Sequence, residues 1–415
     1  MRLTNFWTIL LLSHRVFGRI LAQKPVPIRA LASVAISFAA FSAEVSGLES
    51  DDYFDFGDDD GGEDVNEDFN ILANEHSNEE APTSAAKILE SYSIYSSADA
   101  HTRKFVQPVL AYITPWHNRG YDIAKYFRGK FTHLSPVWYT IKPNGKNWEL
   151  TGAHDVDKGW IAEVTAPVER ENESDFVPQM VPRFRIEIST EEHLKSLASD
   201  DNAFSTVNKL IIQECRTQNF DGFVLEFLYS GYTQPLIQQL SFAAKTAKLQ
   251  FYLVITPTHG DNVLFETPHF EGYKHLVDGF SLMTYDFSNP QKPGPNSPIH
   301  WVKDNVLRLA PNKEDRAKLL VGLNMYGNDY SKYRHESLIG SKYIKILKEY
   351  NSKFVWSSDA QEHALIYDDE DREAHVVWYP TIESVKTRVD LLENLGTGIS
   401  FWEIGQGLDY FYETL

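Results

Sequence analysis

The stretch NFDGFVLEFLYSG occupies residues 219–231 and places one carboxylate, Glu226, inside an otherwise apolar run. A short apolar run of this kind predicts a buried β-strand. Side chains alternate along a strand, so every second residue would share the inward face. That face would carry Gly222, Val224, Glu226 and Leu228. The fold class therefore depends on whether the rest of the chain predicts more buried strands of this kind, with helices between them.

Seven further segments resemble this strand, and amphipathic stretches lie between them. The predicted strands are 108–114, 131–139, 182–188, 220–227, 250–256, 279–285, 319–325 and 398–402, and the clearest helices are 202–218, 235–248, 300–309 and 382–395. Alternating strands and helices favour parallel pairing with right-handed crossovers. Eight such units over about 300 residues fit a closed (β/α)₈ TIM barrel of the α/β class.

A doubly wound open sheet is the alternative architecture. It is disfavoured because the residues after the first strand, PWHNRG, are not a Gly-rich dinucleotide turn. The barrel would carry a short insertion, residues 328–379, before its last helix and strand. Its tryptophans, Trp356 and Trp378, would either line the cleft or attach a β-rich excursion to the barrel, and we favour the second.

The chain divides into three parts by composition. Residues 1–47 contain basic flanks and apolar runs that end in small residues, which is typical of a secretory signal or an N-terminal extension placed before one. Residues 48–104 include an acidic segment poor in aliphatic residues, which predicts a disordered linker. Residues 105–415 would form the barrel. The sequon at Asn172 is compatible with glycosylation on a secreted or lysosomal route.

Composition excludes several function classes. The chain has 415 residues and a formal net charge of −19, so nucleic acid and anionic membranes would be repelled at long range. No apolar run reaches the length of a membrane-spanning helix, so we do not expect an integral membrane protein. A single cysteine, Cys215, rules out an internal disulfide. The histidines His259, His269 and His275 lack a metal-binding spacing, and we expect neither a metal nor a cofactor.

Aromatic residues gather at the carboxyl ends of the predicted strands, where barrels carry their chemistry. They are Trp116, Trp138, Tyr139, Tyr285, Tyr326 and Trp402. Flat apolar faces beside polar groups suit the rings of sugars, because stacking buries area while the rim binds hydroxyls. Any one of these residues taken alone would be assigned to the core. Their clustering predicts a cleft for glycans.

At this point the folded region resembles glycoside hydrolase family 18, the chitinases and chitinase-like proteins. The resemblance runs in order through VLAYIT, FTHLSPVWY, NFDGFVLEF, SLMTYDF, VGLNMYG and GTGISFWEIG. Within the family it is strongest to the stabilin-interacting chitinase-like type. That resemblance implies a secreted or lysosomal protein that captures oligosaccharides or microbial glycans in innate immunity and is handled by a scavenger receptor.

The family motif bears on catalysis. Active members carry D-G-x-D-x-D-x-E on the fourth strand, where the last Glu protonates the glycosidic oxygen and the substrate's acetamide is the nucleophile. Aligned through Asp221 and Gly222, this chain has Val224 and Glu226 at the two later Asp positions and Leu228 at the Glu. Glu226 lies two residues before the catalytic position, about 6.6 Å deeper along the strand, which is too far for it to replace the missing Glu. The proton donor is missing at Leu228.

The resemblance also implies ligand contacts. Tyr285 and Asp286 match the family residues that contact the acetamide and the nearby sugar, and Trp402 matches the floor beneath the ring. For Glu226, a role in a structural network and a direct contact with the ligand are equally favoured. Glu403 matches no acid of the family. The residues predicted to bind ligand are Tyr112, Trp116, Trp138, Glu226, Met283, Tyr285, Asp286, Tyr326 and Trp402.

The function that we predict at this stage is a saccharide-binding, lectin-like protein that is not an enzyme. Two alternatives stay open. One is a weak glycoside hydrolase whose acid has moved to Glu226 or Glu403. The other is a protein-interaction scaffold with a vestigial cleft. Glycan identity, oligomeric state and the true start of the mature chain do not follow from the sequence.

Overall fold

The computed structural model describes residues 83–145, 147–168, 175–188, 190, 193–195, 197, 201–227, 234–260 and 264–415. Three sequence predictions lie outside these residues: the signal region 1–47, glycosylation at Asn172 and the acid position Leu228. Among the described residues, no helix has the length and apolarity that crossing a bilayer requires.

The predicted barrel is confirmed, with all eight strands in place. Two of them are interrupted, so the second strand is β2 followed by β3 and the third is β5 followed by β6. The barrel strands are β1 (Val109–Ile113), β2 (His133–Pro136), β3 (Tyr139–Asn144), β5 (Gln179–Met180), β6 (Arg183–Ile186), β7 (Gly222–Glu226), β8 (Gln250–Ile255), β9 (Gly279–Leu282), β10 (Leu319–Asn324) and β16 (Gly398–Trp402). A hairpin strand, β4 (Asn147–Thr151), extends β3.

Parallel pairing runs around a complete ring. β1 pairs with β2, β2 with β5, and β3 with β6, so the two interruptions are bridged. Pairing then continues through β7, β8, β9, β10 and β16. The ring closes where β16 pairs with β1, for example Ile399 beside Val109. Every backbone edge of the barrel is therefore paired.

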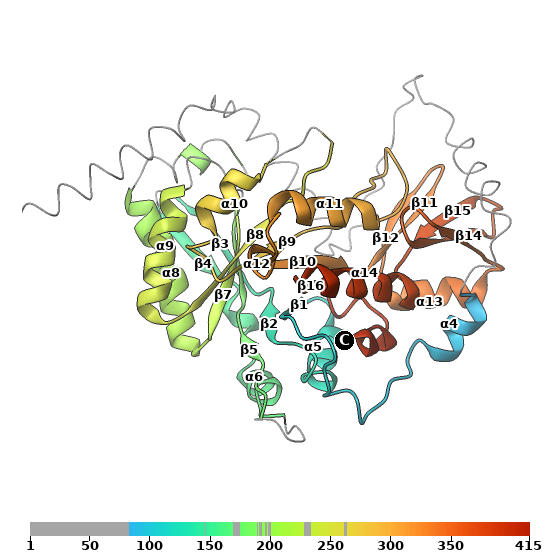
Figure 1. Cartoon of the computed structure of the whole chain (residues 1–415), viewed down its shortest axis with the longest axis horizontal. Coiled ribbons are helices and arrows are strands. Elements are labelled where there is room, and N and C mark those ends of the chain that lie inside the picture. The colour runs from blue at the N-terminus through green and yellow to red at the C-terminus, as the bar shows by residue number, and fades with distance from the viewer. Residues whose placement is uncertain are drawn as a thin grey trace, which may run out of the picture.

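Helices cover the outside of the barrel, as Figure 1 shows for α8, α9 and α10. The helices are α5 (Asn118–Tyr126), η1 (Ala153–Asp155), α6 (Lys158–Val164), α8 (Asp201–Gln218), α9 (Gln234–Ala247), α10 (Thr267–Tyr273), α11 (Ile299–Leu309), α12 (Lys313–Arg316), α14 (Ile382–Leu395) and η3 (Asp409–Thr414). The start of α14 is fixed by Thr381, whose side chain accepts a hydrogen bond from the Ser384 backbone, and Gly396 ends it in a left-handed conformation.

The barrel has two apolar layers, as expected for strands buried on both faces. A small inner group fills the barrel, and a large outer group packs between strands and helices. The inner group is Leu110, Tyr112, Val137, Val181, Val224, Tyr252, Val254 and Leu320, with Met283 and Trp402 packed against it.

The insertion after β10 is more elaborate than the β-rich excursion that we predicted, because it contains a helix and a five-stranded antiparallel sheet. Its elements are β11 (Gly327–Ser331), β12 (His335–Leu338), α13 (Gly340–Glu349), β13 (Lys353–Ser357), β14 (Glu362–Asp368) and β15 (Ala374–Trp378). Trp378 is buried in the sheet's own apolar cluster, while Trp356 is half-buried and packs on His363. Figure 1 shows this unit beside the barrel, opposite α8 and α9.

A helix also precedes the predicted boundary at residue 105. α4 (Ala85–Ser91) begins with Ser84, whose side chain accepts a hydrogen bond from Lys87, and it packs against α13 of the insertion. Ile88 is buried in the outer core. Packed structure therefore extends into the range 48–104 that the composition assigned to a linker.

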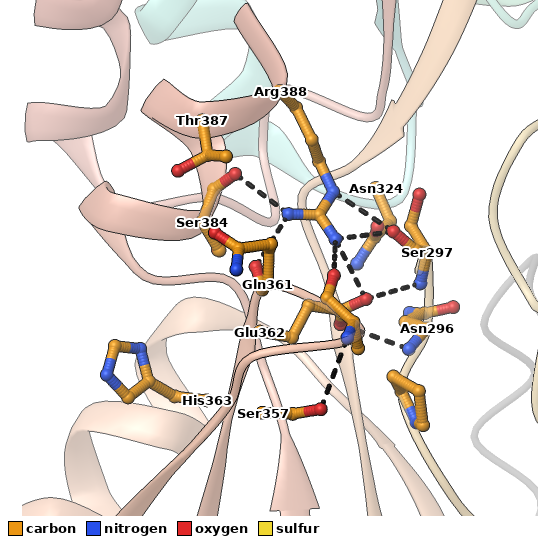
Figure 2. Close-up of polar contacts among 12 residues, drawn as sticks. Asn296, Ser297, Asn324, Ser357, Gln361, Glu362, His363, Ser384, Thr387 and Arg388 are labelled. Carbon is orange, nitrogen blue, oxygen red and sulfur yellow. Dashed lines mark hydrogen bonds and ion pairs between the residues drawn. The ribbon is translucent and has the colours of Figure 1, made fainter. Parts of the chain in front are cut away.

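A buried ion pair joins the insertion to the barrel, as Figure 2 shows. Arg388 on α14 lies 3.0 Å from the Glu362 carboxylate on β14, and both side chains are almost fully buried. The guanidinium also donates to the backbone carbonyls of Ser297, Ala360, Gln361 and Ser384. Glu362 in turn accepts hydrogen bonds from the backbone N–H groups of Asn296 and Ser297. This network satisfies two buried charges that would otherwise be very costly.

We expect Arg388→Met to lower the free energy of unfolding by about 3–5 kcal/mol, because Glu362 would remain buried without its partner. Urea unfolding followed by fluorescence measures this. Lys386→Met is the matched control, because Lys386 pairs with Asp390 on the exposed face of the same helix and should cost less than about 1 kcal/mol. Equal losses in the two variants would contradict the role given to burial.

Candidate functional site

The carboxyl ends of the barrel strands bring most of the predicted site residues together. Tyr112 lies on β1, Glu226 ends β7, and Trp402 ends β16. Tyr285 and Asp286 follow β9, and Tyr326 follows β10. This end of a parallel barrel is where active sites of the fold are built.

Tyr112 and Trp402 form the apolar part of the site. Their ring centres lie 5.2 Å apart at an interplanar angle of 58°. The Tyr112 hydroxyl donates to Ser281 Oγ at 2.9 Å, which satisfies it inside the barrel. Tyr112 is buried, whereas Trp402 keeps part of its surface exposed. Trp402 therefore offers a ring face that a ligand can reach, on a support held by Tyr112.

Glu226 is buried beside two arginines of the neighbouring strand. Arg183 Nη1 donates to Glu226 Oε2 at 2.5 Å, and Arg185 Nε lies 3.7 Å from Oε1. The Arg183 guanidinium also lies 5.7 Å from the centre of the Trp402 ring. Both oxygens of Glu226 thus face cations. The geometry favours the structural network over the other roles considered for Glu226.

Asp286 has a different environment. The Tyr326 hydroxyl donates to Asp286 Oδ1, and the Asp286 backbone N–H donates to Asn296 Oδ1 at 2.8 Å. The backbone of Asp286 has a φ of 60°, a left-handed conformation that Asp tolerates better than most residues. Burial raises the pKa of Asp286 to about 7, while the hydrogen bond from Tyr326 opposes that shift. A carboxyl with this pKa can hold or release a proton near neutral pH.

Tyr285 completes the polar side of the mouth, next to Asp286. Its ring centre lies 6.3 Å from that of Tyr326, in an edge-to-face arrangement. Burial raises the pKa of the Tyr285 hydroxyl well above its ordinary value, so the group stays protonated as a hydrogen-bond donor.

Glu403 is held by internal partners. Its carboxylate lies 2.7 Å from His117 Nδ1 and accepts a hydrogen bond from the Gly405 backbone at 2.9 Å. The side chain is 1% exposed, and the Trp402–Glu403 peptide is cis. Burial raises the pKa of Glu403, and His117 acts against that shift. Glu403 therefore ties the end of β16 to the start of α5 and does not face the site.

Three other predicted residues lie at the margin of this group or away from it. Trp116 follows β1 and is exposed, and Met283 packs against the barrel interior. Trp138 is buried in the outer core, where its Nε1–H donates to the Tyr121 hydroxyl at 2.8 Å and its ring packs near Trp160. The ligand contacts of all the predicted residues stay predictions.

Sequence reasoning missed Arg183 and Arg185. Both lie in PRFRIEI, which was recognised as a strand, and their spacing of two places them on one face. β6 sets Arg185 directly beside Glu226 on β7. The signal was therefore present as alternating arginines on a predicted barrel strand, a pattern that requires a buried carboxylate nearby.

Comparison with known proteins identifies relatives of part of the chain. A family model described as glycosyl hydrolases family 18 matches residues 182–407, more than half of the chain. The cortical fragment-lytic enzyme of Bacillus anthracis is 30% identical over 158 residues, which are 36% of this chain and 36% of that protein. The chain thus spans about a third of the length of that curated relative.

Solved structures share the fold. A chitinase from Chromobacterium violaceum superposes with a TM-score of 0.63 at 17% identity, over 74% of this chain and 98% of that one. A family 18 chitinase from Cycas revoluta, solved in complex with (GlcNAc)4, has a TM-score of 0.59 at 17% identity, over 74% of this chain and 97% of that one.

These comparisons contradict the prediction that the chain is not an enzyme. The curated relative is named as a lytic enzyme, and a spore cortex-lytic enzyme is among the structural neighbours. The prediction rested on one missing proton donor at Leu228, a position outside the described residues. Loss of one acid does not remove acid chemistry from a site that holds a second carboxyl, Asp286, with a pKa of about 7.

The raised pKa of Asp286 predicts a pH-dependent contribution to stability. Because the folded-state pKa lies above the unfolded value of 3.8, stability is fully present below about pH 4 and is lost as the pH rises through 7. We expect the unfolding free energy of the wild type, relative to Asp286→Asn, to fall by roughly 3 kcal/mol between pH 4.5 and 8. Urea unfolding at several pH values measures this difference.

Asp304→Asn supplies the control, because Asp304 is exposed on α11. This variant controls for the loss of a surface carboxylate, so the effect of Asp286 is the part of the pH dependence that Asp304→Asn does not show. A flat profile for Asp286→Asn as well would show that Asp286 is ionised throughout.

Proposed function

The chain belongs to glycosyl hydrolase family 18, and on that premise we propose that the mouth of its barrel binds an oligosaccharide of N-acetylated amino sugars. The observation that carries this proposal is the partly exposed Trp402 ring, which Tyr112 supports, together with the hydrogen-bonding groups that follow β9 and β10. An apolar platform beside a polar rim is the arrangement that sugar rings require.

The polar rim supports an N-acetyl substituent in particular. An acetamide has one N–H donor and one carbonyl acceptor, so it needs partners of both kinds. The Tyr285 hydroxyl is a donor, and while Asp286 is ionised its second oxygen is an acceptor; in the protonated state that the hydrolysis proposed below needs, the carboxyl is a donor instead. The bound (GlcNAc)4 of the Cycas chitinase makes this oligosaccharide a suitable first probe.

Hydrolysis of the bound glycan is the second function that we propose. When the substrate's own acetamide is the nucleophile, the protein must supply one proton donor rather than two carboxyl groups. Asp286 is the carboxyl at the mouth whose pKa, about 7, leaves it partly protonated near neutral pH. In this scheme Asp286 gives its proton to the glycosidic oxygen while the acetamide oxygen attacks the anomeric carbon, so the bond between that carbon and the glycosidic oxygen breaks and the remaining sugar leaves as an alcohol. Water then attacks the anomeric carbon, opens the oxazolinium ring and returns a proton to the Asp286 carboxylate.

Glu226 and Glu403 support this assignment by exclusion. The first faces two guanidinium groups, and the second is paired with His117 away from the site. Neither is placed to donate a proton to a glycosidic oxygen. The relative's name as a lytic enzyme supports hydrolysis of a glycan by this chain. Because the match covers only 36% of each chain, the reaction is a proposal.

Other expectations stay predictions. The secretory or lysosomal route rests on residues 1–47, and a scavenger-receptor partner rests on the resemblance to the stabilin-interacting type. Recognition of microbial glycans has the same basis. They do not affect the tests below.

We expect Trp402→Ala to weaken binding of (GlcNAc)4 by about tenfold or more, because the stacking surface is lost. Isothermal calorimetry on the full chain measures the dissociation constant. Tyr333→Ala, which removes an aromatic ring that is 71% exposed on the insertion, should leave it unchanged. Unchanged affinity in Trp402→Ala would remove Trp402 from the binding site.

We expect slow release of new reducing ends from (GlcNAc)4, abolished in Asp286→Asn and retained in Asp304→Asn. Chromatographic product analysis over long incubation detects this. Loss of turnover in Glu226→Gln, with turnover retained in Asp286→Asn, would assign the acid to Glu226 instead. Saturable binding with no products in the wild type would contradict the hydrolysis proposal and leave the binding proposal intact.

A further inference from the structure

A second polar cluster lies in the insertion, away from the barrel mouth. Asp369, Glu373 and His375 each bring one potential ligand atom within 4.8 Å of the others. They come from the turn between β14 and β15 and from the start of β15. The stretch DEDREAH, residues 369–375, encodes all three. Sequence analysis predicted no metal site, and this spacing escaped it because the ligands meet only when the hairpin forms.

His375 is fixed in orientation by buried partners. Its Nδ1 lies 2.9 Å from Asp329 Oδ1 on β11, and its ring stacks on Tyr367 with centres 4.7 Å apart. The Tyr367 hydroxyl donates to the other oxygen of Asp329 at 2.7 Å. His375 itself is 8% exposed. The imidazole is therefore held by Asp329 through Nδ1, which leaves Nε2 as the free ring nitrogen.

The Nε2 atom is buried without a hydrogen-bond partner and faces the Asp369 carboxylate. Its nearest acidic oxygen is Asp369 Oδ2, at 3.6 Å. A buried ring nitrogen left in this way requires an explanation, because nearly all such atoms are paired in folded proteins. The distance is too long for a hydrogen bond and close to the separation of two ligands on one ion.

Both carboxylates have one oxygen engaged by the protein. Asp369 Oδ1 accepts the backbone N–H groups of Asp371 and Glu373, at 2.9 and 2.8 Å. Glu373 Oε1 accepts the backbone N–H of Tyr333 at 3.2 Å. The other oxygen of each, Oδ2 and Oε2, has no such partner among the described residues. The turn thus presents two preoriented oxygens beside one imidazole nitrogen.

We propose that Asp369, Glu373 and His375 bind a divalent transition metal ion of the Zn²⁺ class, with water completing the coordination. One imidazole and two carboxylates form a common ligand set for such ions. Asp329 would be the outer partner that orients the histidine. Ligands about 2.0–2.1 Å from a tetrahedral ion lie roughly 3.3 Å apart, so His375 and Asp369 need little movement, and the half-buried Glu373 can adjust by about an ångström.

The bound ion would connect three parts of the insertion sheet. It would join the β14–β15 turn to β15 itself, and through Asp329 to β11. The Glu373 contact with Tyr333 extends the connection to the turn between β11 and β12. The site is therefore structural, and it is independent of the function proposed for the barrel.

The test uses the full chain after treatment with a chelator and dialysis. Calorimetric titration with ZnCl₂ should detect one site, and thermal unfolding should shift to higher temperature with Zn²⁺. Ca²⁺ at the same concentration should give a much smaller shift, because it prefers six to eight oxygen ligands. Equal shifts with both ions would indicate general attraction to an acidic protein and would overturn the proposal.

Two variants of one hairpin make the test specific. Glu373→Gln should weaken Zn²⁺ binding at least about tenfold, whereas Glu370→Gln, which removes the same charge from an exposed neighbour, should leave it unchanged. Asp369→Asn keeps the oxygen that accepts the backbone hydrogen bonds and provides a second ligand variant. Absence of a Zn²⁺ site, or equal effects of Glu373→Gln and Glu370→Gln, would mean that the cluster is only a histidine bridging carboxylates.

Discussion

The pairing of β16 with β1 is the contact on which the rest of the structure depends. It joins the last strand of the chain to the first and converts a twisted sheet into a ring. Once the ring is closed, side chains from β1, β7, β9, β10 and β16 must meet at one end of it. Residues nearly 300 positions apart, such as Tyr112 and Trp402, become neighbours for this reason alone.

Closure also explains how two carboxyl groups of one mouth differ. Glu226 points inward from a strand whose neighbour supplies Arg183 and Arg185, so its charge is compensated by cations. Asp286 follows its strand and is enclosed by neutral groups, so burial raises its pKa to about 7. Two acids in one site thus have different neighbours, cations beside Glu226 and neutral groups beside Asp286.

The fold was predictable from sequence to a high degree, and the site only in part. Apolar runs such as QFYLVIT reveal strands because burial on both faces leaves few polar residues in them. Contacts between neighbouring strands are harder to predict. The pairing of Arg185 with Glu226, for example, depends on the strand register, which the sequence does not show. Trp138 shows the same limit, since an aromatic residue near a strand end packs as well against outer helices as in a cleft. The missing acid at Leu228 stays a prediction, and one residue could not decide whether the chain is an enzyme.

The buried guanidinium of Arg388 has a consequence for how the molecule comes apart. It bonds to carbonyls in the loop before α11, in the turn before β14 and in its own helix, so barrel and insertion share one set of hydrogen bonds. An insertion joined to the barrel only by its two covalent connections would unfold locally at a small cost in free energy. Here, opening the insertion would separate Glu362 from Arg388 and leave the guanidinium of the barrel helix without its ion-pair partner. Amide hydrogens of the insertion sheet should therefore exchange by the same global opening as those of the barrel, and the two parts behave as one cooperative body.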